Sequence, residues 1–63
     1  MRIELDFNSP DAIYIQLRNQ IVMQIAQEQL REGDSLPSVR CLAGELGVNM
    51  HTVNKAYAML RQE

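Results

Sequence analysis

Residues that usually build active sites, disulfides and metal centres are scarce in this sequence. Its 63 residues include one cysteine, one histidine and three glycines. A single cysteine cannot form an internal disulfide, and one cysteine with one histidine falls short of the four ligands of a typical zinc site. The chain also lacks a glycine-rich phosphate loop, a serine–histidine–aspartate set and paired carboxylates that would face one site. We therefore expect a protein without enzyme activity, metal or cofactor.

Long apolar stretches are missing as well. No run approaches the roughly 20 apolar residues that a membrane span needs. Residues 1–4 lack the basic region followed by an apolar region that begins a signal peptide. These absences predict a cytoplasmic protein with no membrane partner.

What remains is the composition of a small folded domain. Hydrophobic residues make up 46% of the chain, which is typical of a folded rather than a disordered sequence. No repeat, low-complexity segment or linker divides the chain, so we expect one domain over residues 1–63. A domain this short buries only about 60% of its unfolded surface, which makes it marginally stable.

Residues 36–57 have the pattern of a helix-turn-helix. Pro37 disfavours helix in the residue before it, and Ser38 can accept a hydrogen bond from the free amides of a helix that it opens. Gly47 suits a left-handed helix end because it has no Cβ, and Asn49 can cap a second helix. Apolar residues at helical spacing give each helix a buried stripe: Val39, Leu42, Ala43 and Leu46 in the first, and Val53, Ala56, Tyr57 and Leu60 in the second.

The other side of the second helix is polar and basic. At 3.6 residues per turn, His51, Asn54 and Lys55 lie away from the apolar stripe, and Met50 and Thr52 begin the same helix. Side chains of these kinds fit a DNA major groove, which is about 12 Å wide. From the pattern alone, an ordinary solvated helix face is an equal alternative.

The first residues of the chain predict a short strand. Ile3, Leu5 and Phe7 alternate with acidic residues, which is typical of a half-buried strand. A lone strand is not stable without a partner, so an extended segment lying over the helices is the alternative.

A long helix is predicted over residues 10–29, because Ser9 and Pro10 are typical of a helix start. Its buried stripe is predicted to be Ile13, Leu17, Ile21 and Ile25, and its glutamines are predicted to face solvent. A second apolar strip on this helix consists of Ile15, Val22 and Ala26. Two interpretations stay open for this strip. It is either covered by Ile3, Leu5, Phe7 and Met59, or it contacts a second copy or another domain.

The combined pattern resembles the N-terminal DNA-binding domain of GntR-type bacterial transcription regulators, and most of all their YtrA-like branch. In the motif, the resemblance rests on Leu36-Pro37-Ser38, Arg40, Leu42-Ala43, Leu46-Gly47-Val48-Asn49, Thr52-Val53 and Lys55-Ala56-Tyr57. Upstream, it rests on Ile13-Tyr14, Gln16-Leu17, Gln20-Ile21, Ile25 and Leu30…Gly33-Asp34. It thus covers nearly the whole chain from residue 13 to residue 60.

The resemblance implies a mainly α, three-helix helix-turn-helix of the winged type, with a short N-terminal strand. The wing hairpin and the C-terminal dimerisation helices of the family would follow the second motif helix and fall outside residues 1–63. The implied function is sequence-specific binding of double-stranded DNA by a transcriptional repressor that occupies an operator. Two copies would bind half-sites about one helical turn apart as a homodimer. No small molecule is expected to bind this segment. The alternative is a protein-interaction module on the same fold that does not bind DNA.

The resemblance also places a DNA contact on Arg40. Ser38 and Asn49 open helices, whose free amides suit phosphates, while Asn54 and Lys55 have the chemistry to contact bases or phosphates. Family members often carry basic residues where this chain has Met50 and Asn54, which predicts a different operator sequence. The predicted DNA-binding residues are Ser38, Arg40, Asn49, Met50, His51, Thr52, Asn54 and Lys55, and the predicted self-association residues are Ile15, Val22 and Ala26.

The net charge of −2 is unusual for a nucleic-acid binder, but the charge is unevenly distributed. Residues 1–34 carry three basic and six acidic side chains, or −3, whereas residues 35–63 carry three basic and two acidic ones, or +1. The motif half is therefore mildly basic. We expect few phosphate contacts per chain, and modest DNA affinity unless two copies bind together.

Overall fold

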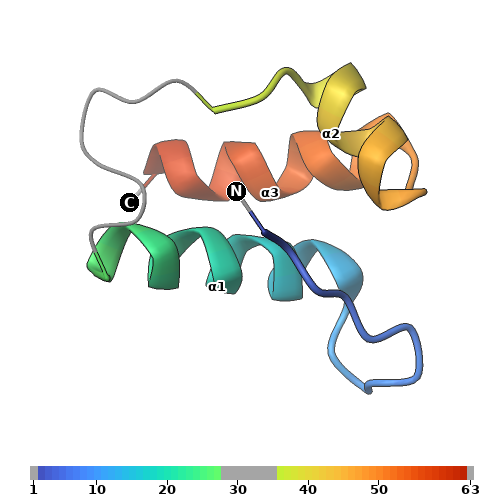
Figure 1. Cartoon of the computed structure of the whole chain (residues 1–63), viewed down its shortest axis with the longest axis horizontal. Coiled ribbons are helices and arrows are strands. Elements are labelled where there is room, and N and C mark those ends of the chain that lie inside the picture. Colours follow the sequence, from blue (N-terminus) through green and yellow to red (C-terminus); the bar gives the residue numbers. More distant parts are fainter. Residues whose placement is uncertain (1, 28–35, 63) are drawn as a thin grey trace.

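The computed structural model describes residues 2–27 and 36–62, and these form three helices. Helix α1 covers Ile13–Ala26, α2 covers Val39–Leu46 and α3 covers Met50–Gln62 (Figure 1). The predicted mainly α class is thus confirmed. Neither described segment contains a strand, so the predicted N-terminal strand is wrong and its alternative, an extended segment lying over the helices, is the arrangement found.

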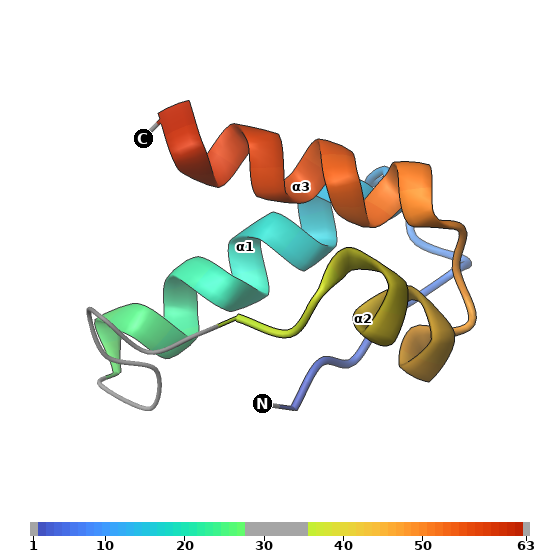
Figure 2. The same cartoon turned by 90° about the horizontal axis from the view of Figure 1, so that it is seen from above.

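Helix α3 holds the fold together, since it packs against both other helices. It runs alongside α1 in Figure 1, and α2 packs near the first turns of α3, as Figure 1 and Figure 2 both show. The buried core joins all three helices and consists of Leu17, Ile21, Leu42, Ala43, Val53, Ala56 and Tyr57. The predicted buried stripes of α2 and α3 supply most of this cluster, and Leu36, Val39, Leu46, Val48 and Leu60 pack against it while partly buried.

The helix-turn-helix begins and ends its helices at the residues that the sequence predicts. The Ser38 hydroxyl accepts a hydrogen bond from the Cys41 amide at 3.0 Å and caps α2. Gly47 ends α2 with φ of 71°, and its amide donates to the Ala43 carbonyl at 3.0 Å. Asn49 Oδ1 accepts from the amide of Thr52 at 2.9 Å and so caps α3. Three local capping interactions therefore fix the angle at which α3 leaves the turn.

Helix α1 begins later than its sequence predicts. Its N-cap is Ala12, and no side chain caps the helix, whereas the prediction placed Ser9 at the cap and Pro10 in the first turn. The Ser9 hydroxyl instead accepts from the Asp11 amide at 3.1 Å and closes a turn ahead of the helix. At the other end Gln27 is the C-cap, while the predicted end at Gln29 lies outside the described residues.

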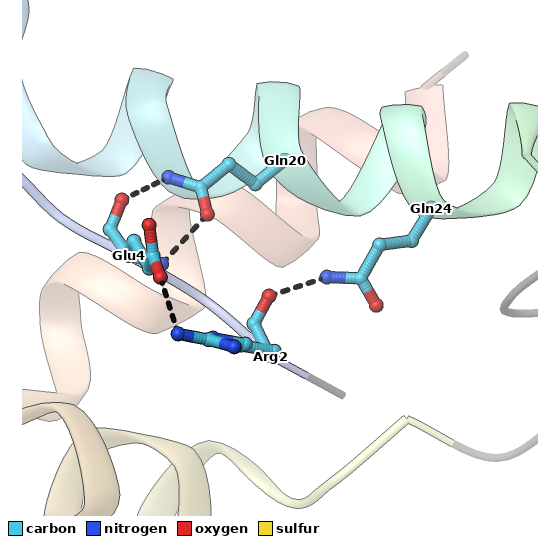
Figure 3. Close-up of polar contacts among 4 residues, drawn as sticks. All are labelled: Arg2, Glu4, Gln20 and Gln24. Atoms are coloured by element: carbon cyan, nitrogen blue, oxygen red, sulfur yellow. Dashed lines mark hydrogen bonds and ion pairs between the residues drawn. The ribbon is translucent and has the colours of Figure 1, made fainter.

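Residues 2–6 run along α1, antiparallel to it, before the chain turns at residues 7–11. Three glutamines spaced four residues apart bind the peptide groups of every second residue. The pairs are Gln16 with Asp6, Gln20 with Glu4 and Gln24 with Arg2, and the last two are drawn in Figure 3. We call this set of contacts the glutamine ladder. These glutamines were predicted to face solvent, and that prediction is wrong for all three.

The ladder explains how the N-terminal segment stays extended without a partner strand. Gln16 and Gln20 each bind the amide and the carbonyl of one residue, with amides donating to Oε1 at 2.9 Å from Asp6 and at 2.8 Å from Glu4. A primary amide therefore replaces the peptide group of a neighbouring strand. Side chains of the intervening Ile3 and Leu5 pack against the core, as their alternation predicts.

Two large apolar side chains lie outside the core, contrary to prediction. Phe7 is 65% exposed because the chain turns there, with the Ser9 amide bonded to the Asp6 carbonyl. Ile25 is 48% exposed, whereas Leu17 and Ile21 earlier in the same stripe are fully buried. The stripe of α1 thus contributes to the core only in the middle of the helix.

Candidate nucleic-acid interface

The buried stripe of α3 determines which of its side chains face outward. Val53, Ala56 and Tyr57 are buried, so the opposite side of the helix carries His51, Asn54 and Lys55, which are all exposed. Because α3 has 3.6 residues per turn, these three lie on one face. The predicted arrangement of this helix is therefore confirmed, with a buried apolar side and an exposed polar side.

The remaining predicted site residues lie at or near the starts of α2 and α3. Arg40 on α2 is exposed, and so is Met50 at the start of α3, with 48% of its surface accessible. Ser38 and Asn49 are exposed, and Thr52 is half-buried. The structure thus brings His51, Asn54 and Lys55 together on one helix face, while Ser38 and Arg40 come from the neighbouring helix.

Three of the predicted DNA-binding residues already have a structural role. The oxygens of Ser38 and Asn49 accept capping hydrogen bonds, and the Thr52 hydroxyl lies 3.1 Å from Asn49 Oδ1, to which it donates. These groups are therefore occupied in holding the two helix starts. What these three side chains leave toward a ligand is the Asn49 side-chain NH2 group, the Ser38 hydroxyl proton and the Thr52 methyl group.

The cations of the motif half are not neutralised by nearby carboxylates. Within the described residues, Arg40, Lys55 and Arg61 make no ion pair, whereas Arg2 pairs with Glu4 at 2.9 Å on the N-terminal segment. The described carboxylates of the first half therefore form no ion pair with the cations of the motif half.

One residue of α1 reaches the outward face of α3, and sequence reasoning did not assign it to the site. The Lys55 ammonium lies over the Tyr14 ring, with Nζ 3.9 Å from the ring centroid. Tyr14 is half-buried and packs against the core. The only signal in the sequence was the position of Tyr14 beside the buried stripe of the helix, which does not indicate a contact with a residue 41 positions later.

Tyr57 anchors α3 to the chain that enters α2. Its hydroxyl donates to the Pro37 carbonyl at 2.7 Å, and only 8% of its surface is exposed. Burial raises the pKa of the Tyr57 phenol above its ordinary value, and the nearby Cys41 raises it further. The neutral, donating form of Tyr57 is therefore the form that this packing stabilises.

Other kinds of site find little support among residues 2–27 and 36–62. No group of three histidines, cysteines or acidic residues there could hold a metal ion. None of the described helices has the length and apolar character that crossing a membrane requires. An open groove of about 410 Å³ beside the glutamine ladder shares no residue with the predicted site; its lining is Arg2, Glu4, Gln20, Met23, Gln24 and Gln27.

The chain is similar to known transcription regulators over almost its whole length. It is 39% identical over 61 residues to the HTH-type transcriptional repressor YtrA of Bacillus subtilis, which covers 97% of this chain and 47% of that protein. It is 38% identical over 58 residues to the HTH-type transcriptional regulator Rv1152 of Mycobacterium tuberculosis, covering 92% of this chain and 48% of the relative. The chain thus spans about half the length of these relatives.

A solved structure gives the same result in three dimensions. The structure of YtrA from Sulfolobus acidocaldarius, a GntR-family transcription factor, superimposes with a TM-score of 0.93 at 52% sequence identity. The match covers 95% of this chain and 64% of that one. The family described as bacterial regulatory proteins of the gntR family also matches residues 13–63. The chain belongs to this gntR family of regulatory proteins, and the predicted resemblance to its YtrA-like members is confirmed.

Proposed function

We propose that this chain binds double-stranded DNA in a sequence-specific manner and represses transcription by occupying an operator. The observation that carries the proposal is the outward face of α3, which presents His51, Asn54 and Lys55 on a helix fixed by its buried side. An α-helix with its side chains is about 10–12 Å in diameter, which matches the width of the major groove. The relatives that share this motif are transcription regulators by name.

The predicted site residues divide into those that can contact bases, those that can contact phosphates and those that fix the helix starts. Asn54 has the amide geometry to bind adenine, and His51 lies beside it on the same face. Lys55 and Arg40 make no ion pair with any residue that the structure describes; both suit phosphates, and either can bind guanine as well. Met50 is exposed and apolar, which suits a thymine methyl group. Ser38, Asn49 and Thr52 contribute by fixing the starts of α2 and α3, where the remaining free backbone amides suit a phosphate.

We further propose that residues 1–63 form the DNA-binding unit of a cytoplasmic homodimer. With few cations per chain, one copy provides little phosphate attraction, and two copies on half-sites about one helical turn apart provide twice as much. The outward side of α1 offers an apolar strip for self-association, since Val22 is 36% exposed, Ala26 is exposed and Ile15 is half-buried.

The proposal is tested by selecting duplexes from a randomised DNA library and measuring their affinity at two salt concentrations. DNA binding predicts an affinity that falls steeply with salt. Lys55→Ala or Arg40→Ala should each lower the slope of log K against log salt by about 1 if that residue contacts a phosphate. His51→Ala and Asn54→Ala should instead change which base is preferred at one position of the selected site.

Arg2→Ala is the matched control, because it removes one positive charge from a residue that already pairs with Glu4 and lies outside the motif. It should leave both affinity and salt slope close to those of the parent. If the selected pool shows no sequence enrichment, or if Lys55→Ala, Arg40→Ala and the control all behave alike, the DNA-binding proposal is rejected.

A protein-interaction module is the second candidate, because several large apolar residues of α1 are exposed: Val22, Met23 and Ile25. This candidate predicts that Val22→Asp lowers the oligomer size measured by sedimentation. It also predicts that the parent chain shows no salt-dependent DNA binding. Gln27→Glu adds a charge to an exposed position at the end of the same helix and should leave oligomer size unchanged. A monomer under all conditions would reject both this candidate and the self-association strip.

A further inference from the structure

The contact between Lys55 and Tyr14 connects the outward face of α3 to the first turn of α1. Lys55 Nζ lies 3.9 Å from the centroid of the Tyr14 ring, which is within the range of a cation–π interaction. Tyr14 is the second residue of α1, and its half-buried side chain packs against the core, which restrains the ring. Lys55 itself is exposed and makes no ion pair with the described residues.

We propose that Tyr14 is a positioning residue that holds the Lys55 ammonium in place for a DNA backbone phosphate. This role rests on the proposed function, and it adds a residue of α1 to an interface otherwise built from α2 and α3. Tyr14 acts through Lys55 and need not touch DNA itself.

The physical reason is the flexibility of lysine. A free lysine side chain has four rotatable bonds, and fixing it on binding costs free energy. A ring that already holds the ammonium reduces that cost, because fewer conformations remain to be lost. The ring occupies one side of the ammonium, which has three N–H donors, so donors remain for a phosphate oxygen. A carboxylate partner would fix the side chain too, but it would also cancel the charge that attracts DNA.

Lys55 differs in this respect from Arg40, the other cation of the motif that the sequence assigns to DNA. Arg40 is exposed and has no ring, ion pair or hydrogen bond to restrain it among the described residues. Arginine loses less freedom for each hydrogen bond because its planar fork is already rigid. The structure thus restrains the more flexible of the two cations.

A double-mutant cycle tests the role of the ring. Tyr14→Leu removes the ring, Tyr14→Phe keeps it, and each is made with Lys55 and with Lys55→Met. Affinity is measured for a duplex selected by the parent chain, at two salt concentrations. Tyr14→Leu should weaken binding about two- to fivefold when Lys55 is present and hardly at all in the Lys55→Met chain. Tyr14→Phe should restore affinity to within about twofold of the parent.

A spectroscopic measurement shows whether the contact exists in solution. The ring current of Tyr14 should shift the NMR signals of the Lys55 ε-methylene protons, and Tyr14→Leu should abolish that shift while Tyr14→Phe preserves it. Thermal unfolding of each variant establishes that it is folded at the temperature of the binding assay.

The outcomes separate this role from the proposed function. Equal losses on Tyr14→Leu with and without Lys55 would mean that Tyr14 acts only through packing, and tighter binding would mean that the ring withholds Lys55 from DNA. Either result overturns the positioning role while leaving DNA binding intact. A parent chain that binds no selected duplex overturns the proposed function itself, and the positioning role with it.

Discussion

The two halves of this domain are held together in different ways. In the helix-turn-helix half, each boundary is fixed by a neighbour in sequence: Ser38 and Asn49 cap their helices within three residues, and Gly47 ends α2. In the N-terminal half, α1 has no side-chain cap. Its partner segment is held by glutamines 10 to 22 residues away.

This difference separates local from long-range determinants of structure. Short-range capping sets the helix boundaries of the motif that presents His51, Asn54 and Lys55. The N-terminal half depends on contacts that form only when the chain is already folded. We therefore expect the helix boundaries of the motif half to be set within the motif, and the N-terminal segment to depend on single side chains of α1.

The largest effect is expected from two isoleucines of α1, one turn apart. Ile21 is fully buried, and Ile21→Ala should lower the free energy of unfolding by about 2–5 kcal/mol, enough to unfold much of a domain of this size. Ile25 is 48% exposed, and Ile25→Ala should change the free energy of unfolding by less than about 0.5 kcal/mol. Urea unfolding followed by circular dichroism compares the two. Similar losses would mean that Ile25 is buried in solution, as its sequence pattern predicted.

The next effect concerns the glutamine ladder. Gln20→Met keeps the length of the side chain but removes both hydrogen bonds to Glu4. The free energy of unfolding should fall by about 1–2 kcal/mol. The amide of Glu4 should then exchange with deuterium much faster. Gln27→Met is the control, because Gln27 is exposed and makes no side-chain hydrogen bond within the described chain. Unchanged protection at Glu4 in Gln20→Met would show that the segment is extended for another reason.

Changing the caps of α2 and α1 should shift the stability of the domain in opposite directions. Ser38→Ala removes the cap of α2 and should destabilise the domain by about 1 kcal/mol. Ala12→Ser adds a hydroxyl at the uncapped start of α1, where Ala12 already has extended dihedral angles, and should stabilise the domain by up to about 1 kcal/mol. The midpoint of thermal unfolding should thus fall in one variant and rise in the other. A fall in both would indicate that the Ala12 position cannot orient a capping hydroxyl.

The smallest effect is a dependence of stability on alkaline pH. The pKa of Tyr57 is raised in the folded chain, so the unfolded chain loses this proton first as the pH rises. The stabilisation that the protonated Tyr57 contributes is therefore fully present below the pKa of the unfolded chain, about 10. It is lost as the pH rises through the higher pKa of the folded chain. Above about pH 10, the free energy of unfolding should fall less steeply with pH in Tyr57→Phe than in the parent. At neutral pH the variant should be less stable than the parent, because it lacks the hydrogen bond to Pro37. Parallel stability curves would exclude Tyr57 as the titrating group.

The sequence predicted the helix-turn-helix well because its signals are local. Ser38, Gly47 and Asn49 each act within three or four residues, and the apolar spacing of α3 directly gives its exposed side. The N-terminal half was predicted less well. Ser9-Pro10 has the composition of a helix start, yet the hydroxyl of Ser9 closes a turn before α1. The alternation of Ile3 and Leu5 correctly predicted their inward side, but not a set of glutamines as the partner.

The candidate site shows the same limit. The residues of one helix face could be predicted from helical periodicity, whereas the ring of Tyr14 under Lys55 could not, because periodicity does not relate two helices to each other. Nor did the pattern distinguish a side chain that caps a helix from one that is free to bind a ligand. Ser38 and Asn49 were predicted as DNA contacts, and their oxygens are occupied by backbone amides.

The spacing of the glutamine ladder limits how far such a pairing can extend. Four residues of α-helix advance about 6.0 Å, whereas two residues of an extended chain advance about 6.6 Å. The two repeats therefore drift apart by about 0.6 Å at each step, or about 1.2 Å between the first and third glutamines. Flexible glutamine side chains can absorb that drift over three contacts, but each added contact would stretch the next bond further. A helix can thus hold a short extended segment in this way, whereas the growing mismatch would weaken the pairing over a longer one, unlike the matched repeats of a sheet.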